Sequence, residues 1–267
     1  MPTWKILIPF LIFISCKKDS FSPTAVLTTN PPIHVALQIP QKNTDQFGEV
    51  PNVSYFKSAI ILCAGNSLTL GSYLPADENY PAQLQKNHLF DSSIVLNKGI
   101  DRISTEQMFS RISIDIQPNF KSAGRNILVA WEIGNDIFWY GTKDSAAFAL
   151  FEAYCKTLHE QDWQVIAVTV PYRNNDYMTK SLLTPGGDDS IQYANKCEKV
   201  NSLLSDQWKT FSDGLADLAQ DSALSGYNPK FYRPDHVHLT VDGYAVVERI
   251  IYDKIVEVNT RWKKKPI

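Results

Sequence analysis

Four short segments of this chain carry groups whose types and spacing could do nucleophilic chemistry. The first is Gly65-Asn66-Ser67-Leu68-Thr69-Leu70-Gly71, which follows an apolar run directly. Its glycines permit a sharp turn that would present the Ser67 hydroxyl as a nucleophile. Serine between glycines is also ordinary turn or helix-cap chemistry. The other three segments decide between these interpretations.

A segment near the C-terminus offers a base and a carboxylate together. Asp235 and His238 are three residues apart, just before the last predicted helix. Histidine can take the proton from a serine hydroxyl, while a carboxylate holds its tautomer and stabilises the imidazolium. Such a pair could be surface polarity, but its place at the final strand–helix connection favours function. We expect His236, which lies between them, to be at the rim or to face solvent.

The remaining two segments supply hydrogen-bond donors. Asn97-Lys98-Gly99 ends the second apolar run, and Gly134-Asn135-Asp136 ends the third. Taken singly, the first would be a turn and Asn135 a helix cap. Together they would place a backbone N–H and an amide in one crevice, where attack on an ester creates an oxyanion. Each fixed donor to an oxyanion contributes about 3 kcal/mol.

An alternation of strand-like and helix-like segments must position these groups. Short apolar runs typical of strands buried on both faces are Ala59–Ala64, Ile94–Leu96, Ile127–Trp131 and Val165–Val170. Helical spacing of apolar residues occurs in Pro81–His88, Ser104–Ile116, Ser145–Glu160, Tyr193–Phe211 and a last helix with Val247, Ile250, Ile251, Ile255 and Val258 on one stripe. The pattern predicts a parallel sheet covered by helices on both faces, with the ligand at the carboxyl ends of the strands.

With its four segments in this order, the chain resembles the SGNH (GDSL-like) hydrolases. The resemblance implies an α/β fold, a three-layer α/β/α sandwich with a parallel, flavodoxin-like sheet, and neither a metal nor another cofactor. It implies that Ser67 is the nucleophile and that Asp235 and His238 complete the triad. It assigns the oxyanion hole to the N–H groups of Ser67 and Gly99 and to the Asn135 side chain.

Two positions depart from the family's pattern. Asn66 stands where the family usually has aspartate, and it keeps an oxygen acceptor and adds amide donors while losing the charge. Arg102 stands where a glycine is more common. Its guanidinium could bind a substrate carboxylate or sugar hydroxyl, or pair with a surface carboxylate such as Asp101. Asn66 and Arg102 could also line the substrate site, as could Trp139 and Tyr172, which follow the third and fourth strands.

The N-terminal segment has the pattern of a lipoprotein signal peptide. Lys5 precedes the apolar run Ile6–Ile14, which is too short to span a membrane, so residues 1–15 are predicted to be cleaved. The sequence Phe13-Ile14-Ser15-Cys16 resembles a bacterial lipobox, in a loose form like that of Bacteroidota, and this implies a lipid on Cys16. An ordinary signal peptide with an accidental cysteine is the alternative.

Residues 16–53 are rich in Pro, Thr, Ser, Asn and Gln and predict a tether. A short docked strand at Ile33–Ile39 is the competing possibility. The folded domain then covers residues 54–267. We expect an exported lipoprotein of the cell envelope, at the outer membrane, facing the periplasm or the cell surface.

Charge and cysteine content limit the partners and the crosslinks. The 26 basic and 28 acidic residues nearly cancel, so we expect no nucleic-acid partner, membrane contact only through the lipidated Cys16, and no obligate protein partner. Besides Cys16, the chain has Cys63, Cys155 and Cys197. We expect Cys63 to be a small buried hydrophobe, and a Cys155–Cys197 bridge is possible.

The predicted function is an exported serine ester hydrolase that removes short acyl groups, such as acetyl, from carbohydrate or other small esters. The loops at the expected crevice are polar and aromatic and contain no long aliphatic run. Met178, Leu182 and Leu183 could contribute to an acyl trough, so a lipid-directed acyl hydrolase resembling a lysophospholipase or lipase is an alternative. A ligand-binding module that has lost turnover is the third, and Asn66 keeps it open.

Overall fold

The computed structural model describes three stretches of the chain, residues 59–88, 93–174 and 190–261. All of them belong to one compact unit that spans residues 49–267. Several predictions concern residues outside the described stretches: the signal peptide, the lipidated Cys16, the tether, the alternative strand Ile33–Ile39, the boundary at residue 53, and the apolar trio Met178, Leu182 and Leu183.

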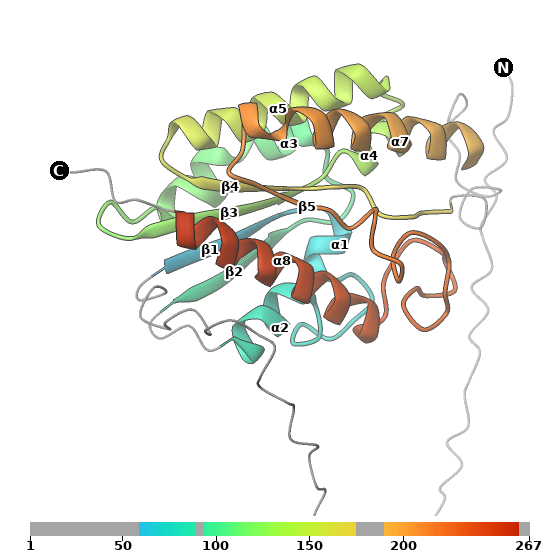
Figure 1. Ribbon diagram of the computed structural model, residues 1–267, viewed down its shortest axis with the longest axis horizontal. Helices are drawn as coiled ribbons and strands as arrows, with labels where there is room; N and C mark the ends of the chain where they lie inside the picture. The colour runs from blue at the N-terminus through green and yellow to red at the C-terminus, as the bar shows by residue number, and fades with distance from the viewer. Residues whose placement is uncertain (1–58, 89–92, 175–189, 262–267) are drawn as a thin grey trace, which may run out of the picture. The chain divides into compact units, whose positions relative to one another are not determined.

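A parallel sheet of five strands in the order β2-β1-β3-β4-β5 forms the centre of the domain (Figure 1). The strands are β1 (Ala59–Gly65), β2 (Ile94–Gly99), β3 (Arg125–Trp131), β4 (Gln164–Val168) and β5 (Gly214–Ala216). Chain order reverses beside β1, because β2 lies on one side of it and β3 on the other. Ligands of open α/β sheets bind at such a switch point, outside the carboxyl ends of the strands.

Helices cover both faces of the sheet, as predicted (Figure 1). One face packs against α3 (Thr105–Ser110), α4 (Gly134–Phe138), α5 (Asp144–Glu160) and α7 (Ser190–Gln207). The other packs against α2 (Tyr80–Asn87) and α8 (Val241–Arg261). Side chains of β1 alternate between two cores, with Ile60 and Leu62 in the first and Ile61 and Cys63 in the second. Burial on both faces explains the uninterrupted apolar run.

Three details of the secondary structure differ from prediction. The stretch Ser104–Ile116 is not one helix, because α3 ends at Ser110 and a π-helical turn, η2 (Ile112–Ile116), follows. Strand β2 is not buried on both faces, since it is an edge strand and Ile94 is 46% exposed. Strand β5 was not predicted, because three residues that include a glycine leave no periodic signal.

The remaining short elements are α1 (Ser67–Leu70), η3 (Gln117–Asn119) and η4 (Trp208–Thr210). Along α8, the predicted stripe is confirmed: Val247, Ile251, Ile255 and Val258 are buried, and Ile250 is partly buried against the same core. Cys63, Cys155 and Cys197 are buried and free, so no Cys155–Cys197 bridge forms. No helix of the described stretches is long and apolar enough to cross a membrane.

Candidate active site

Ser67 begins α1 directly beyond the carboxyl end of β1. Gly65 permits the turn, because a Cβ there would come within 2.4 Å of the Trp131 carbonyl oxygen. Asn66 caps the short helix, its side-chain Oδ1 accepting from the Leu68 N–H at 2.8 Å. In Figure 1, α1 and the loop that precedes α8 lie at the same end of the sheet. The turn therefore presents Ser67 to that loop.

The loop before α8 brings the predicted base to the predicted nucleophile. His238 Nε2 lies 3.1 Å from Ser67 Oγ, although the two residues are 171 positions apart. His238 Nδ1 lies 2.8 Å from Asp235 Oδ2. Because a carboxylate can only accept, Nδ1 must carry the proton, and in the neutral ring Nε2 is left to accept from the serine hydroxyl. The three residues thus form a continuous hydrogen-bonded chain in the tautomer that general-base catalysis needs.

Asp235 is held as a carboxylate by the groups around it. Burial raises its pKa, but hydrogen bonds from the His238 ring and from the N–H groups of His238 and Val237 outweigh burial and lower the pKa to about 2. Both N–H groups donate to Oδ1, at 2.9 Å and 3.0 Å. Oδ2 is therefore free for the imidazole, and Asp235 is ionised wherever His238 has to act.

Two of the predicted oxyanion donors have an N–H that no hydrogen bond within the described stretches uses. Ser67 is the first residue of α1, so its N–H has no acceptor within the helix. Asn135 is buried near the start of α4, where its Nδ2 donates to the Ile103 carbonyl at 3.1 Å and its Oδ1 accepts from Arg173 at 3.3 Å. A side-chain amide has two N–H groups, so one of them remains for an oxyanion.

Gly99 has a structural reason for being glycine. A Cβ at this position would lie 2.1 Å from the Leu70 nitrogen, because α1 packs closely against the end of β2. The Gly99 N–H donates to the Asn97 side-chain oxygen at 2.9 Å. It could join an oxyanion hole only after releasing Asn97, so that role stays a prediction.

Two of the predicted substrate-lining residues lie together on the rim. The Arg102 guanidinium is 5.3 Å from the centre of the Trp139 ring, and its Nε is 3.6 Å from Asp101. The ion pair is exposed and contributes little. Arg102 has a φ of +56°, and its carbonyl accepts from the Tyr140 hydroxyl at 3.1 Å. The surroundings thus fix its backbone and leave its side chain at the surface.

Asn66, also predicted to line the site, is only 3% exposed, and the fourth residue, Tyr172, is anchored in the structure. Its ring packs edge-on against Tyr232 at 5.8 Å, and its N–H donates to the Leu224 carbonyl at 3.0 Å. Tyr172 and its neighbour Arg173 also line a groove of about 630 Å³ that runs along α7. His236 is half-buried and stacks on Tyr227 with ring centres 3.7 Å apart. It takes no part in the triad, in agreement with the sequence.

Two residues at the site were missed by the sequence analysis. Tyr73 lies edge-on to the His238 ring at 4.8 Å, with a φ of +71°, and no motif signals it. Glu132 follows β3 and is 1% exposed. Its Oε2 accepts from Asn66 Nδ2, and its Oε1 accepts from the Asn135 N–H at 2.9 Å. A carboxylate directly after the apolar run Ile127–Trp131 was a signal that could have been used.

The pKa of Glu132 reflects opposing influences. Burial raises it well above its ordinary value, and the nearby Asp136 carboxylate acts in the same direction. The hydrogen bonds from Asn66 and Asn135, and the Arg173 charge, lower it. Asp136 itself accepts from the N–H and hydroxyl of Thr105, which ties the loop after β2 to the loop after β3.

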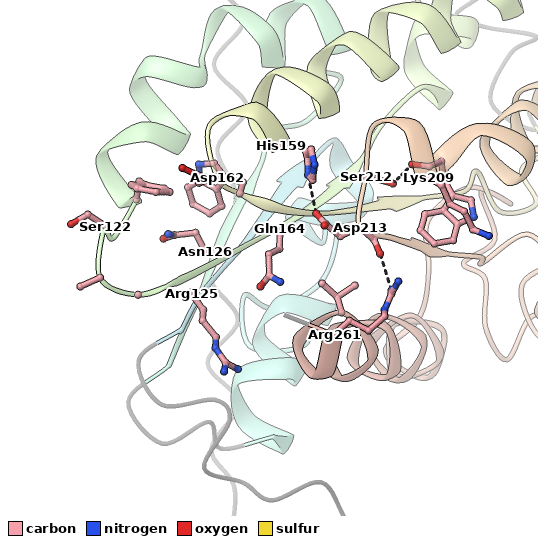
Figure 2. A pocket seen from close by; sticks show the side chains of 16 residues that line it. Ser122, Arg125, Asn126, His159, Asp162, Gln164, Lys209, Ser212, Asp213 and Arg261 are labelled. Atoms are coloured by element: carbon pink, nitrogen blue, oxygen red, sulfur yellow. Dashed lines mark hydrogen bonds and ion pairs between the residues drawn. The ribbon is translucent and has the colours of Figure 1, made fainter. Parts of the chain in front are cut away.

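A separate pocket of about 970 Å³ lies at the opposite end of the sheet, where β3, β4 and β5 begin (Figure 2). Several of its polar groups are bonded to one another or to the ends of the strands. Asp213 accepts from His159 at 3.1 Å and from the Val165 N–H at 2.8 Å, while Arg261 donates to the Asp213 carbonyl at 2.8 Å. These bonds hold the strand ends together, far from the triad. Nowhere in the described stretches could three His, Cys, Asp or Glu side chains hold a metal ion.

Comparisons with known proteins match the fold and not the sequence. No protein-family model and no curated protein matches the chain. The lipase/acylhydrolase from Enterococcus faecalis has a similar structure, with a TM-score of 0.57 at 16% identity over 78% of this chain and 100% of its own. A member of the lipolytic G-D-S-L family from Veillonella parvula has a TM-score of 0.54 at 16% identity, covering 76% and 100%.

The acetyl xylan esterase AlAXEase is a further similar structure, with a TM-score of 0.53 at 15% identity over 73% of this chain and 98% of its own. In each case nearly the whole of the solved domain is covered. The sheet order and the flanking helices agree with these structures, and the described part of the chain has the SGNH hydrolase fold.

Proposed function

We propose that this protein is a serine ester hydrolase with Ser67, His238 and Asp235 as its triad. The observation that carries the proposal is the hydrogen-bonded chain from Ser67 Oγ through the His238 ring to Asp235. It lies at the carboxyl end of a sheet whose fold is shared with lipolytic and esterase structures. Three residues from two distant segments would not assume this order and tautomer through packing alone.

The geometry supports a two-step acyl transfer. His238 Nε2 takes the Ser67 proton as Oγ attacks the ester carbonyl carbon, and the negative charge forms on the carbonyl oxygen. The Ser67 N–H and the free Asn135 Nδ2–H stabilise that oxygen. The imidazolium, held by the ionised Asp235, gives its proton to the departing alcohol and leaves an acyl-serine. His238 then takes a proton from a water that attacks the acyl-serine, and it returns this proton to Ser67 Oγ as the acyl–oxygen bond breaks and the acid departs.

For the substrate we propose a short acyl group, such as acetyl, on a carbohydrate or another polar alcohol. The cavity that adjoins Asn66 and Leu68 measures only about 10 Å³, and the larger groove beyond Tyr172 and Arg173 has many polar side chains. Those side chains include Glu198, Asn201, Ser202, Asp206, Asp217 and Gln220. Each buried methylene would contribute about 0.8 kcal/mol to binding in an apolar trough, so a groove with this many polar side chains supports a short acyl group.

A lipid-directed acyl hydrolase is the second candidate, favoured by the similarity to a structure named lipase/acylhydrolase. It would use the same triad on longer chains. The third candidate, a binding module without turnover, is disfavoured because the Ser67–His238–Asp235 chain is intact.

We also propose attachment to the cell envelope through a lipid on Cys16, on the support of the lipobox-like sequence alone. One thioether-linked diacylglycerol plus an N-acyl chain exceeds what stable anchoring requires. The envelope location would place the enzyme near extracellular or periplasmic esters.

The direct test combines turnover with active-site labelling. We expect wild-type protein to hydrolyse p-nitrophenyl acetate and to be labelled by a fluorophosphonate on Ser67, as identified by peptide mass spectrometry. The Ser67→Ala variant should be neither active nor labelled. Labelling at another serine, or turnover that survives Ser67→Ala, would rule out the triad.

A further inference from the structure

We propose that the Glu132 carboxylate is a positioning group that joins the nucleophile turn to the oxyanion loop, and that it is the reason why residue 66 is asparagine. This inference rests on the serine hydrolase function proposed above. No hydrogen bond joins Glu132 to Ser67, His238 or Asp235 in the described structure, so its effect on the reaction must pass through Asn66 and Asn135.

The orientation of the Asn66 amide is fixed by its backbone partner. The Leu68 N–H can only donate, so the Asn66 oxygen must face it, and this bond measures 2.8 Å. The amide nitrogen of Asn66 then points to Glu132 Oε2. Asparagine uses its acceptor to cap α1 and its donor to bind the carboxylate. Aspartate could do only the first, because its second oxygen has no N–H to donate to Glu132 Oε2.

The other oxygen of Glu132 holds the oxyanion loop. Its bond to the Asn135 N–H closes a turn over Ile133, which is fully buried at a φ of +89°. This conformation is unfavourable for a β-branched side chain and persists only where the surroundings impose it. The Asn135 side chain, whose Nδ2 is the proposed oxyanion donor, projects from the residue that Glu132 holds.

One buried carboxylate therefore sets the distance between two groups that act on the same carbonyl. Ser67 follows Asn66 directly, and the oxyanion donor belongs to Asn135. Both partners of Glu132 are N–H donors, so each of its two carboxyl oxygens acts as an acceptor. The loss of either bond should misplace one catalytic group without removing it.

The donor and the acceptor of the Asn66–Glu132 hydrogen bond can be exchanged between the two residues, and this exchange provides a test. In Asn66→Asp, two carboxylates face each other. In Glu132→Gln, one oxygen can still accept from Asn135, but the new amide faces the amide of Asn66. In the double variant, the glutamine amide donates to the aspartate, while its oxygen accepts from the Asn135 N–H. The second aspartate oxygen keeps the cap on Leu68.

We expect each single variant to lower kcat for p-nitrophenyl acetate by about 10²-fold, the scale for misplacing a catalytic group by about 1 Å, with KM changed little. The double variant should recover most of this loss. Glu248→Gln is the matched control, because Glu248 is also buried but lies in α8 beside His88. It should leave kcat unchanged.

Unfolding free energies of the four proteins in the cycle provide a readout that does not need turnover. The Asn66–Glu132 bond should appear as a favourable coupling between the two sites. If Glu132→Gln does not fold, the comparison of Asn66→Asp with the double variant still tests the positioning role, because the double variant should have the higher kcat.

The outcomes separate the two proposals. Coupling in stability with recovery of kcat in the double variant supports the positioning role. Additive losses in stability or in kcat would overturn it while leaving the Ser67 assignment standing. If the wild-type protein neither hydrolyses esters nor labels on Ser67, the proposed function is overturned, and the positioning role with it, even where the stabilities of the four proteins show coupling.

Discussion

Replacing Asp235 by asparagine changes one atom of the triad and has two separable consequences. The bonds from the Val237 and His238 N–H groups go to Oδ1, which asparagine retains. The new amide takes the place of Oδ2 and faces His238 Nδ1 at 2.8 Å. A donor there requires Nδ1 to accept, so the ring proton moves to Nε2, which can no longer take the proton from Ser67.

The kinetic consequence should be large and confined to the chemical step. We expect kcat to fall by about 10⁴-fold, the loss that the wrong histidine tautomer produces in a serine triad. KM should change little, because Asp235 lies behind His238. Nitrophenyl acetate turnover measures both quantities.

The second consequence concerns stability and depends on pH. A pKa of about 2 in place of 3.8 means that the ionised Asp235 stabilises the folded state. This amounts to about 1–2 kcal/mol after allowance for screening at a partly exposed side chain. Because the folded-state pKa is lowered, this contribution is fully present above about pH 5 and is lost as the pH falls toward 2.

Denaturant unfolding of wild-type and Asp235→Asn proteins at pH 7, 5 and 3 measures that contribution. The difference in unfolding free energy should be the same at pH 7 and pH 5 and smaller at pH 3. Asp77→Asn is the control, since Asp77 is exposed on the loop before α2. A variant that keeps a tenth or more of wild-type kcat, or a difference in stability independent of pH, would refute the assignment of Asp235.

The remaining predictions concern the nucleophile, the choice of histidine, the acyl group and the anchor. Ser67→Ala should abolish turnover while leaving the thermal unfolding midpoint within a few degrees of wild type, and a large fall in the midpoint would show that the hydroxyl has a structural role. His238→Ala should lower kcat about as much as Ser67→Ala, whereas His236→Ala should be nearly silent; the reverse order would reassign the base. Across acetyl, butyryl and octanoyl nitrophenyl esters, kcat/KM should fall steeply after acetyl, and a rise toward octanoyl would favour the lipid-directed alternative. Cys16→Ser should release the protein from the membrane fraction or leave an uncleaved precursor, and a mature membrane-bound variant would contradict lipidation.

The proposed triad could be predicted because its residues carry strong local signals. Asp235 and His238 are close in sequence, and Ser67 follows a buried strand through a glycine turn. The topology of a parallel sheet then brings the two segments together, since the carboxyl ends of the strands share one edge. Long apolar runs located β1 and β3 for the same reason, because strands buried on both faces leave an uninterrupted pattern.

Local sequence signals do not identify residues whose contacts at the site depend on the folded chain. Tyr73 reaches the His238 ring only because its backbone turns at a positive φ, which no composition rule predicts for tyrosine. Glu132 is 66 residues from Asn66, and its pairing depends on the register of β1 with β3, which sets Gly65 opposite Trp131. The sequence shows a charged residue after an apolar run but not its partner.

Gly99 shows how one residue can satisfy a motif for a different physical reason. The resemblance to the SGNH hydrolases implies that its N–H serves the oxyanion hole, and that role stays a prediction. In the structure the glycine is required by the approach of Leu70, and the N–H is bonded to Asn97. A glycine in a motif can thus reflect the space it leaves, and the N–H it offers has to be judged from its hydrogen bonds. By that criterion the Ser67 N–H, which the start of α1 leaves without a helical acceptor, and the second N–H of the Asn135 amide, whose orientation is fixed by Arg173 and Ile103, are the two proposed donors left for an oxyanion.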